Sequence, residues 1–194
     1  MQNQFDPRTT TGVNTTATVG VPRAARDAGL RSYMLSVYNY MASGVLLTGI
    51  VALLFAPYAA DVLINASGRG LSGLGWIVTL APLGFVMVMS FGINRISTGT
   101  LQLLFWAYAF LMGVSMSTIF LRYTDASIAQ CFFATAAGFA GLTAYDTQKL
   151  KSMYDYVRGT DMLGKVVIMG ALTLYLDFIN MFLFLLRLFG SSRN

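Results

Sequence analysis

Apolar runs of about twenty residues recur along this chain, and each is long enough to cross a hydrocarbon core about 30 Å thick. With 56% hydrophobic and 11% charged residues, the composition is far from that of soluble domains, in which roughly a quarter of the residues are charged. The sequence therefore predicts an all-α, polytopic membrane helix bundle over residues 33–190. The five predicted spans are residues 33–55, 74–93, 100–121, 128–148 and 166–186.

The segments outside these runs indicate how the chain is oriented. Residues 1–32 are polar and rich in threonine and lack the apolar stretch of a secretory signal, so we expect a flexible cytoplasmic tail there and a second short tail at 191–194. Lys and Arg are enriched in cytoplasmic loops. A cytoplasmic N-terminus would place most basic residues on that side, namely Arg8, Arg23, Arg26, Arg31, Arg95, Lys149, Lys151, Arg158 and Lys165. The opposite side would hold Arg69, Arg122, Arg187 and Arg193.

The small inventory of reactive groups excludes several kinds of chemistry. The chain has no histidine, all of its acidic residues are aspartate, and its one cysteine, Cys131, falls within an apolar run. Ser-His-Asp and Cys-His catalysis are thereby excluded, and no credible zinc ligand set remains. Cys131 is most simply a small packing residue. The net charge of +5 is spread along the loops, as expected for topology rather than nucleic-acid binding.

Asp177 lies in the middle of the last apolar run, where a carboxylate has little water around it. Ionising it there is costly, and such residues usually mark an ion or proton pathway. On a helical wheel Gly170, Thr173, Asp177, Asn180 and Arg187 fall within one arc, so we predict a polar face directed at other helices or at a water-filled cavity. The alternative is that Asp177 bonds a neighbouring helix and only fixes packing.

Asp146 ends the fourth run and could form an ordinary interfacial pair with Lys149, three residues later. If it faces Asp177 instead, the two carboxylates share a proton, and the fully deprotonated pair can bind a hard cation such as calcium. The two aspartates lie at different depths in their runs. They can meet only if the fourth helix continues past Leu150 or the fifth begins before Lys165.

Arg95 follows the second predicted span. Its simplest role is that of a positive anchor on the cytoplasmic side. The functional alternative is a cation that pairs with one of the aspartates and holds a path shut.

Several motifs resemble the Bax inhibitor family of membrane proteins, in its bacterial YccA-like branch. The most specific is Leu-Tyr-Leu-Asp-Phe-Ile-Asn at residues 174–180. Supporting motifs lie at residues 37–42, 48–49, 105–113 and 144–148, and the resemblance covers nearly everything from Leu30 onward.

This resemblance implies an inner-membrane protein that acts as a pH-sensitive calcium leak and needs no other cofactor. In the family, two aspartates on the last two helices sense pH and an arginine after the second helix is a latch; by motif position these are Asp146, Asp177 and Arg95. Thr173 and Asn180 would support the polar face. Family members are also described as regulators of cell death and of a membrane protease.

One departure from the family is large, because its members have seven spans and this chain has room for five. Residues 132–137 resemble the start of the family's fourth helix and residues 139–146 the end of its sixth, so the sequence predicts that two spans are missing near Gly138. This region also carries overlapping pairs of small residues, Ala134 with Gly138 and Ala137 with Gly141, which let another helix approach closely.

Two alternative functions remain at this level. The first is a regulator that transports nothing and binds another membrane protein, such as a membrane protease. The second is an intramembrane aspartyl protease, in which two aspartates share a proton to activate water. The chain lacks that enzyme's Gly-x-Gly-Asp and Pro-Ala-Leu motifs, so we expect no enzymatic activity.

Overall fold

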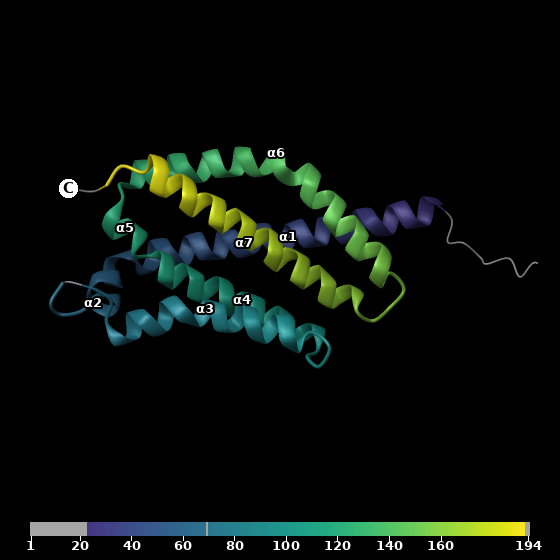
Figure 1. The fold of residues 1–194 in the computed structure, drawn as a ribbon, viewed down its shortest axis with the longest axis horizontal. Helices are drawn as coiled ribbons and strands as arrows, with labels where there is room; N and C mark the ends of the chain where they lie inside the picture. The colour runs from purple at the N-terminus through teal and green to yellow at the C-terminus, as the bar shows by residue number, and fades with distance from the viewer. Residues whose placement is uncertain (1–22, 69, 193–194) are drawn as a thin grey trace, which may run out of the picture.

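The computed structural model describes residues 23–68 and 70–192, with side chains from residue 26 onward except at 142–145 (Figure 1). The elements are α1 (Arg23–Phe55), the 3-10 helix η1 (Ala56–Tyr58), α2 (Ala59–Leu63), α3 (Gly73–Gly92), α4 (Thr98–Met116), α5 (Ile119–Arg122), α6 (Asp125–Val157) and α7 (Leu163–Phe189). Within the described residues, β structure is limited to isolated bridges. The predicted all-α helix bundle is confirmed.

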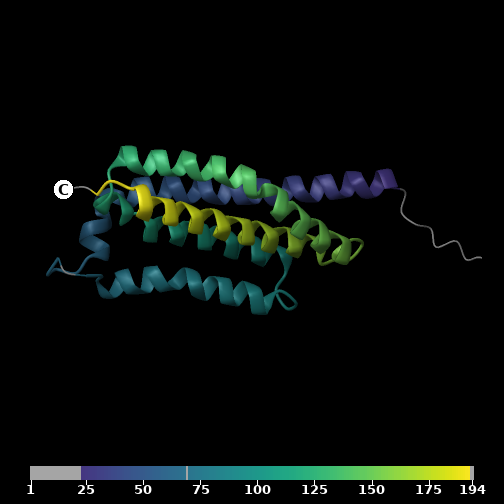
Figure 2. The same cartoon turned by 45° about the horizontal axis from the view of Figure 1, so that its top comes forward.

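Helix α7 packs against α1, α4 and α6 and carries much of the buried core (Figure 1). The ring of Tyr175 meets those of Phe105 and Tyr108 on α4 edge to face, with centroids 6.2 and 5.3 Å apart. On the side toward α6, Phe178 meets Phe139 at 5.6 Å. Helix α3 packs on α4, and Figure 2 shows it at the edge of the bundle, apart from α7.

The structure contains helices for each of the predicted spans. Four segments are long and apolar enough to cross a membrane: Arg26–Leu63, Gly73–Gly92, Thr98–Arg122 and Leu163–Phe189. Helix α6 is a fifth span if its two parts, Asp125–Gly141 and Asp146–Val157, are counted together across a bend of 58°.

Helices α1 and α6, which contain the first and fourth predicted spans, extend beyond those spans. Helix α1 begins at Arg23 rather than near residue 33, and residues 1–22 of the predicted tail lie outside the described residues. The extra turns are held by α6, because Arg26 forms a salt bridge with Asp155 and the ring of Tyr33 lies 5.3 Å from that of Tyr154. Helix α6 in turn continues to Val157, beyond the predicted end of the span at 148.

The connections between long helices gather at two opposite ends of the bundle (Figure 1). The start of α1, the α3–α4 turn and the α6–α7 turn lie at one end, while α2 and the end of α7 lie at the other. This alternation is the one expected for five passes. Which end faces the cytoplasm stays a prediction.

Candidate functional site

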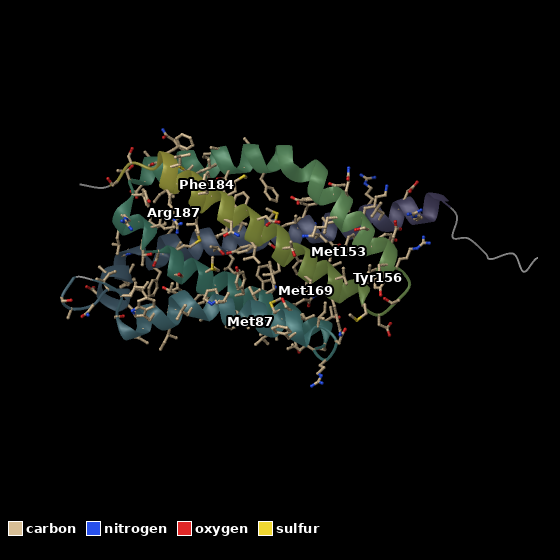
Figure 3. The ribbon with its side chains drawn as sticks, viewed as in Figure 1. Met87, Met153, Tyr156, Met169, Phe184 and Arg187 are labelled. Carbon is tan, nitrogen blue, oxygen red and sulfur yellow. The ribbon has the colours of Figure 1, made fainter. Side chains whose placement is uncertain are left out.

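Asp177 lies midway along α7, on the side of the helix that faces away from the core. Its neighbours Phe178 and Ile179 are buried, whereas Asp177 and Asn180 are exposed. Phe184, 64% exposed, and Arg187 continue this exposed face toward the end of α7 (Figure 3).

The predicted polar arc on α7 is only partly correct. Gly170 is buried, and a β-carbon there would lie 3.0 Å from Leu150 of α6, so this residue belongs to the packed side. Thr173 is half-buried, and its hydroxyl donates to the Met169 carbonyl at 3.0 Å. Asp177 and Asn180 keep the predicted shared face, which no helix of the described chain covers.

Asp146 is half-buried on α6, at the start of that helix's second part. Its carboxylate lies within range of electrostatic repulsion from Asp177 and of attraction to Lys149. Both conditions for bringing the aspartates together are met, since α6 continues past residue 150 and α7 begins before residue 165. Asp146 and Asp177 thus lie on helices that pack against each other, and in the described residues no salt bridge joins Asp146 to Lys149.

Arg95 lies in the turn between α3 and α4, where its side chain is exposed. In the described part of the chain, no hydrogen bond or salt bridge joins it to Asp146 or Asp177. The same turn is connected to α7 in another way, because Lys165 Nζ donates to the Ile93 carbonyl at 2.9 Å. Sequence reasoning treated Lys165 only as a topology signal and missed this connection.

A buried network behind Asp177 was also missed. The Thr48 hydroxyl donates to the Ala109 carbonyl at 2.8 Å and lies 2.7 Å from Tyr175 Oη. Because the single hydroxyl hydrogen of Thr48 is used on Ala109, Tyr175 is the donor to Thr48. The network joins α1, α4 and α7 two residues before Asp177. In the sequence, the only sign of this network was that Thr48 and Tyr175 both fall within the motifs that resemble the family.

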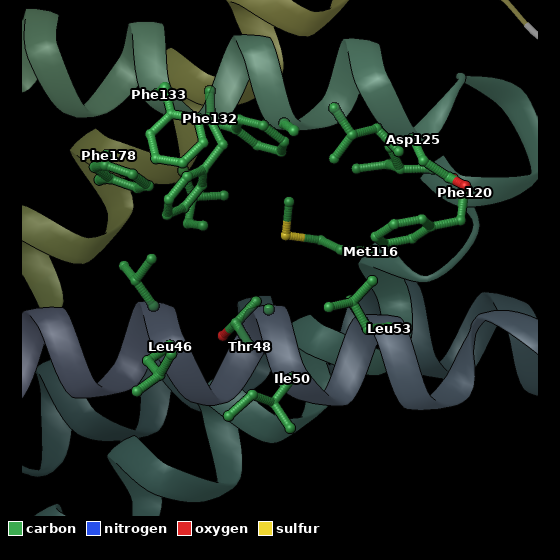
Figure 4. A pocket seen from close by; sticks show the side chains of 18 residues that line it. Leu46, Thr48, Ile50, Leu53, Met116, Phe120, Asp125, Phe132, Phe133 and Phe178 are labelled. Carbon is green, nitrogen blue, oxygen red and sulfur yellow. The ribbon is translucent and has the colours of Figure 1, made fainter.

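A separate cavity of about 370 Å³ lies between α1, α6 and α7, near α5 (Figure 4). Its lining is almost wholly apolar, with Met116 and Phe132 toward the centre and Asp125 at one end. Neither Asp146 nor Asp177 lines it. In the described residues, no group of three or more His, Cys, Asp or Glu side chains could hold a metal ion.

Comparison with known families and sequences finds matches that cover most of this chain. The chain matches the family model "Inhibitor of apoptosis-promoting Bax1" over residues 30–145 and 136–194. It is 37% identical to RP147 of Rickettsia prowazekii over 224 residues, covering 87% of this chain and 93% of that protein. It is likewise 37% identical to the inner membrane protein YbhL of Escherichia coli K12 over 223 residues, covering 86% of this chain and 94% of that protein. No solved structure matches the chain.

These matches also locate a missing internal segment. Because 87% of 194 residues is about 169, roughly 55 of the 224 positions aligned with RP147 have no residue in this chain. The two parts of the family match meet at residues 136–145, within α6. A segment of that length accommodates two spans of about 20 residues with a connection, in agreement with the prediction that two spans are missing near Gly138. The chain therefore belongs to the Bax inhibitor family, as a member that lacks an internal segment present in its relatives.

Proposed function

We propose that this protein is a pH-sensitive calcium leak of the bacterial inner membrane, with Asp146 and Asp177 as the proton-linked cation site. The proposal rests mainly on one observation, the placement of these two aspartates on α6 and α7, which pack against each other. It is supported by membership of the Bax inhibitor family and by the inner-membrane location in the name of the relative YbhL.

The two carboxylates give the site its response to pH. When both are ionised they repel each other and together attract a hard cation, which they bind through oxygen atoms. As pH falls, the pair takes up a proton, the repulsion ends and the attraction for calcium weakens. The cation is therefore held at high pH and released at low pH. Calcium is the cargo here, and water would complete its ligand shell.

Arg95 takes the role of latch in this proposal. Its turn is tied to the start of α7 by the bond from Lys165 to Ile93, so a shift of α7 would move the turn. Closure would bring the Arg95 guanidinium toward the ionised aspartates, and protonation of the aspartates would release it.

The test is calcium efflux from liposomes containing the full chain, measured over a pH series from acidic to mildly alkaline, because exchange of the proton shared by two close carboxylates would alter cation binding. We expect efflux to change with pH in the native protein and to become nearly independent of pH in Asp177→Asn and Asp146→Asn. Asp161→Asn, at an exposed site in the α6–α7 turn, is the matched control and should retain the response. Unaltered pH-dependent efflux in Asp177→Asn would contradict the mechanism. Absence of efflux in every form would favour a regulator that binds another membrane protein.

A further inference from the structure

We propose that two copies of this chain pair in the membrane through the outer face of α6 and α7, so that Asn180 of each copy donates a hydrogen bond to Asp177 of the other. The pairing replaces the cover that an additional internal segment could give in the relatives. It concerns assembly and does not depend on ion conduction.

The first step is the polar group that the single copy leaves uncovered. Asp177 and Asn180 are exposed midway along α7, and Phe184 extends the same face. A carboxylate at that depth is expensive next to lipid, and such groups face protein or water. Within the described chain no helix lies over them. A second protein surface would remove this cost.

The second step is the adjoining surface of α6. Ala134, Ala137, Gly138 and Gly141 are all exposed on α6, so much of this small-residue surface stays open in a single copy. This surface is continuous with the polar face, because a β-carbon on Gly138 would lie 3.6 Å from Met181 Cε, one turn after Asp177. Small residues at such spacing allow two helix backbones to approach closely.

The third step identifies what covers the face. The segment of roughly 55 positions that RP147 has and this chain lacks belongs at residues 136–145, directly beside the uncovered groups. A second copy can fill that place because its own α6 and α7 present the same small and polar residues.

The chemistry of the face is also self-complementary. A two-fold axis along the membrane normal places residues of similar depth opposite each other, and each contact then occurs twice. Asp177 and Asn180 are one turn apart, about 4.5 Å along the helix. The amide of each Asn180 can thus reach the carboxylate of the other copy's Asp177, without placing carboxylate against carboxylate.

Cysteine cross-linking in liposomes tests this pairing. In a Cys131→Ala background, Phe184→Cys should form disulfide-linked dimers on oxidation. Ile77→Cys, near the start of α3, is matched in exposure (65% against 64%) and should not. Adding Asn180→Leu should lower dimer association about tenfold, as expected for the loss of two interhelical hydrogen bonds. Equal cross-linking at both cysteine positions would overturn the proposal.

Subunit counting on the otherwise unmodified full chain, labelled with one fluorophore, gives an independent readout. We expect two bleaching steps for each particle at low density in the bilayer. A single copy for each particle would overturn the pairing. So would a Phe184→Cys adduct with a different membrane protein, which would show that the face has another occupant.

Discussion

At the scale of single residues, Thr48 connects three helices behind the aspartate pair, and a glycine makes this connection possible. Thr48 can bond the Ala109 carbonyl only because α1 and α4 come very close at Gly113. A β-carbon at Gly113 would lie 2.6 Å from Val51 Cβ and 2.8 Å from the Thr48 carbonyl oxygen. Both neighbours belong to the α1 helix, so they cannot move aside independently.

Gly113→Ala should therefore destabilise the protein, because α1 and α4 must move apart and the Thr48–Tyr175 bond is strained. Overpacking of this kind costs about 1–3 kcal/mol. The measurement is the free energy of unfolding in detergent, compared with that of the native chain.

Gly84→Ala on α3 is the matched control, since a β-carbon there meets nothing within 4 Å. It should leave stability unchanged or raise it slightly, because alanine favours helix. Equal destabilisation by both substitutions would show that the close approach at Gly113 has no special cost.

What the sequence could reveal about single residues depended on how unusual their chemistry was. Asp146 and Asp177 stand out because charged groups are rare in apolar runs, and they lie on α6 and α7, which pack against each other. The roles of Thr48 and Tyr175 depend on contacts between distant parts of the chain, so composition and spacing could not show them. Gly170 was wrongly assigned to the polar face, because a helical wheel gives the direction of a residue but not which helix packs against it.

At the scale of helices, the end of α6 shows that apolar periodicity and mean hydropathy predict different things. Hydropathy falls after residue 148 because Lys149, Lys151 and Asp155 follow, so the predicted span ends there, whereas the helix itself continues to Val157. Apolar residues nevertheless continue at helical spacing, at 150, 153, 154 and 157. Leu150, Tyr154 and Val157 are buried. Periodicity rather than mean hydropathy marks a helix that leaves the membrane.

The contact between Arg26 and Asp155 predicts that this last part of α6 depends on α1. Arg26 Nε donates to Asp155 Oδ1 at 3.1 Å, and Nη2 to Oδ2, which gives a two-pronged contact. We expect faster amide hydrogen exchange over residues 149–157 in Asp155→Asn than in the native chain, because one anchor to α1 is lost. Exchange in the α4 helix should not change.

The charge-reversed pair provides the control for this prediction. Arg26→Asp alone should loosen the same residues, and Arg26→Asp with Asp155→Arg should restore slow exchange. Exchange rates that stay native in both single variants would mean that the Tyr33–Tyr154 contact suffices to hold the end of α6.

At the scale of the whole molecule, removal of two spans leaves the order of the remaining passes intact. An even number of spans returns the chain to the side it left, so α7 keeps the direction that it would have with the segment present. The polar turns of the structure alternate between the two ends of the bundle as this requires (Figure 1). The sequence could predict this alternation from its spans. It could not show that Asp177 is exposed on α7, since that depends on which helices are neighbours.

The alternation leads to a prediction about orientation that single cysteines can test. The basic residues predict that the α6–α7 turn is cytoplasmic and that the connection between α2 and α3 is on the other side. In a Cys131→Ala background, a membrane-impermeant thiol reagent added to intact cells that lack an outer membrane should label Ser67→Cys. It should label Asp161→Cys only after the membrane is opened. Both positions are exposed, so accessibility within the fold does not separate them. The reversed pattern would invert the orientation and place Arg95 outside, and labelling of both in intact cells would contradict an odd number of passes between these turns.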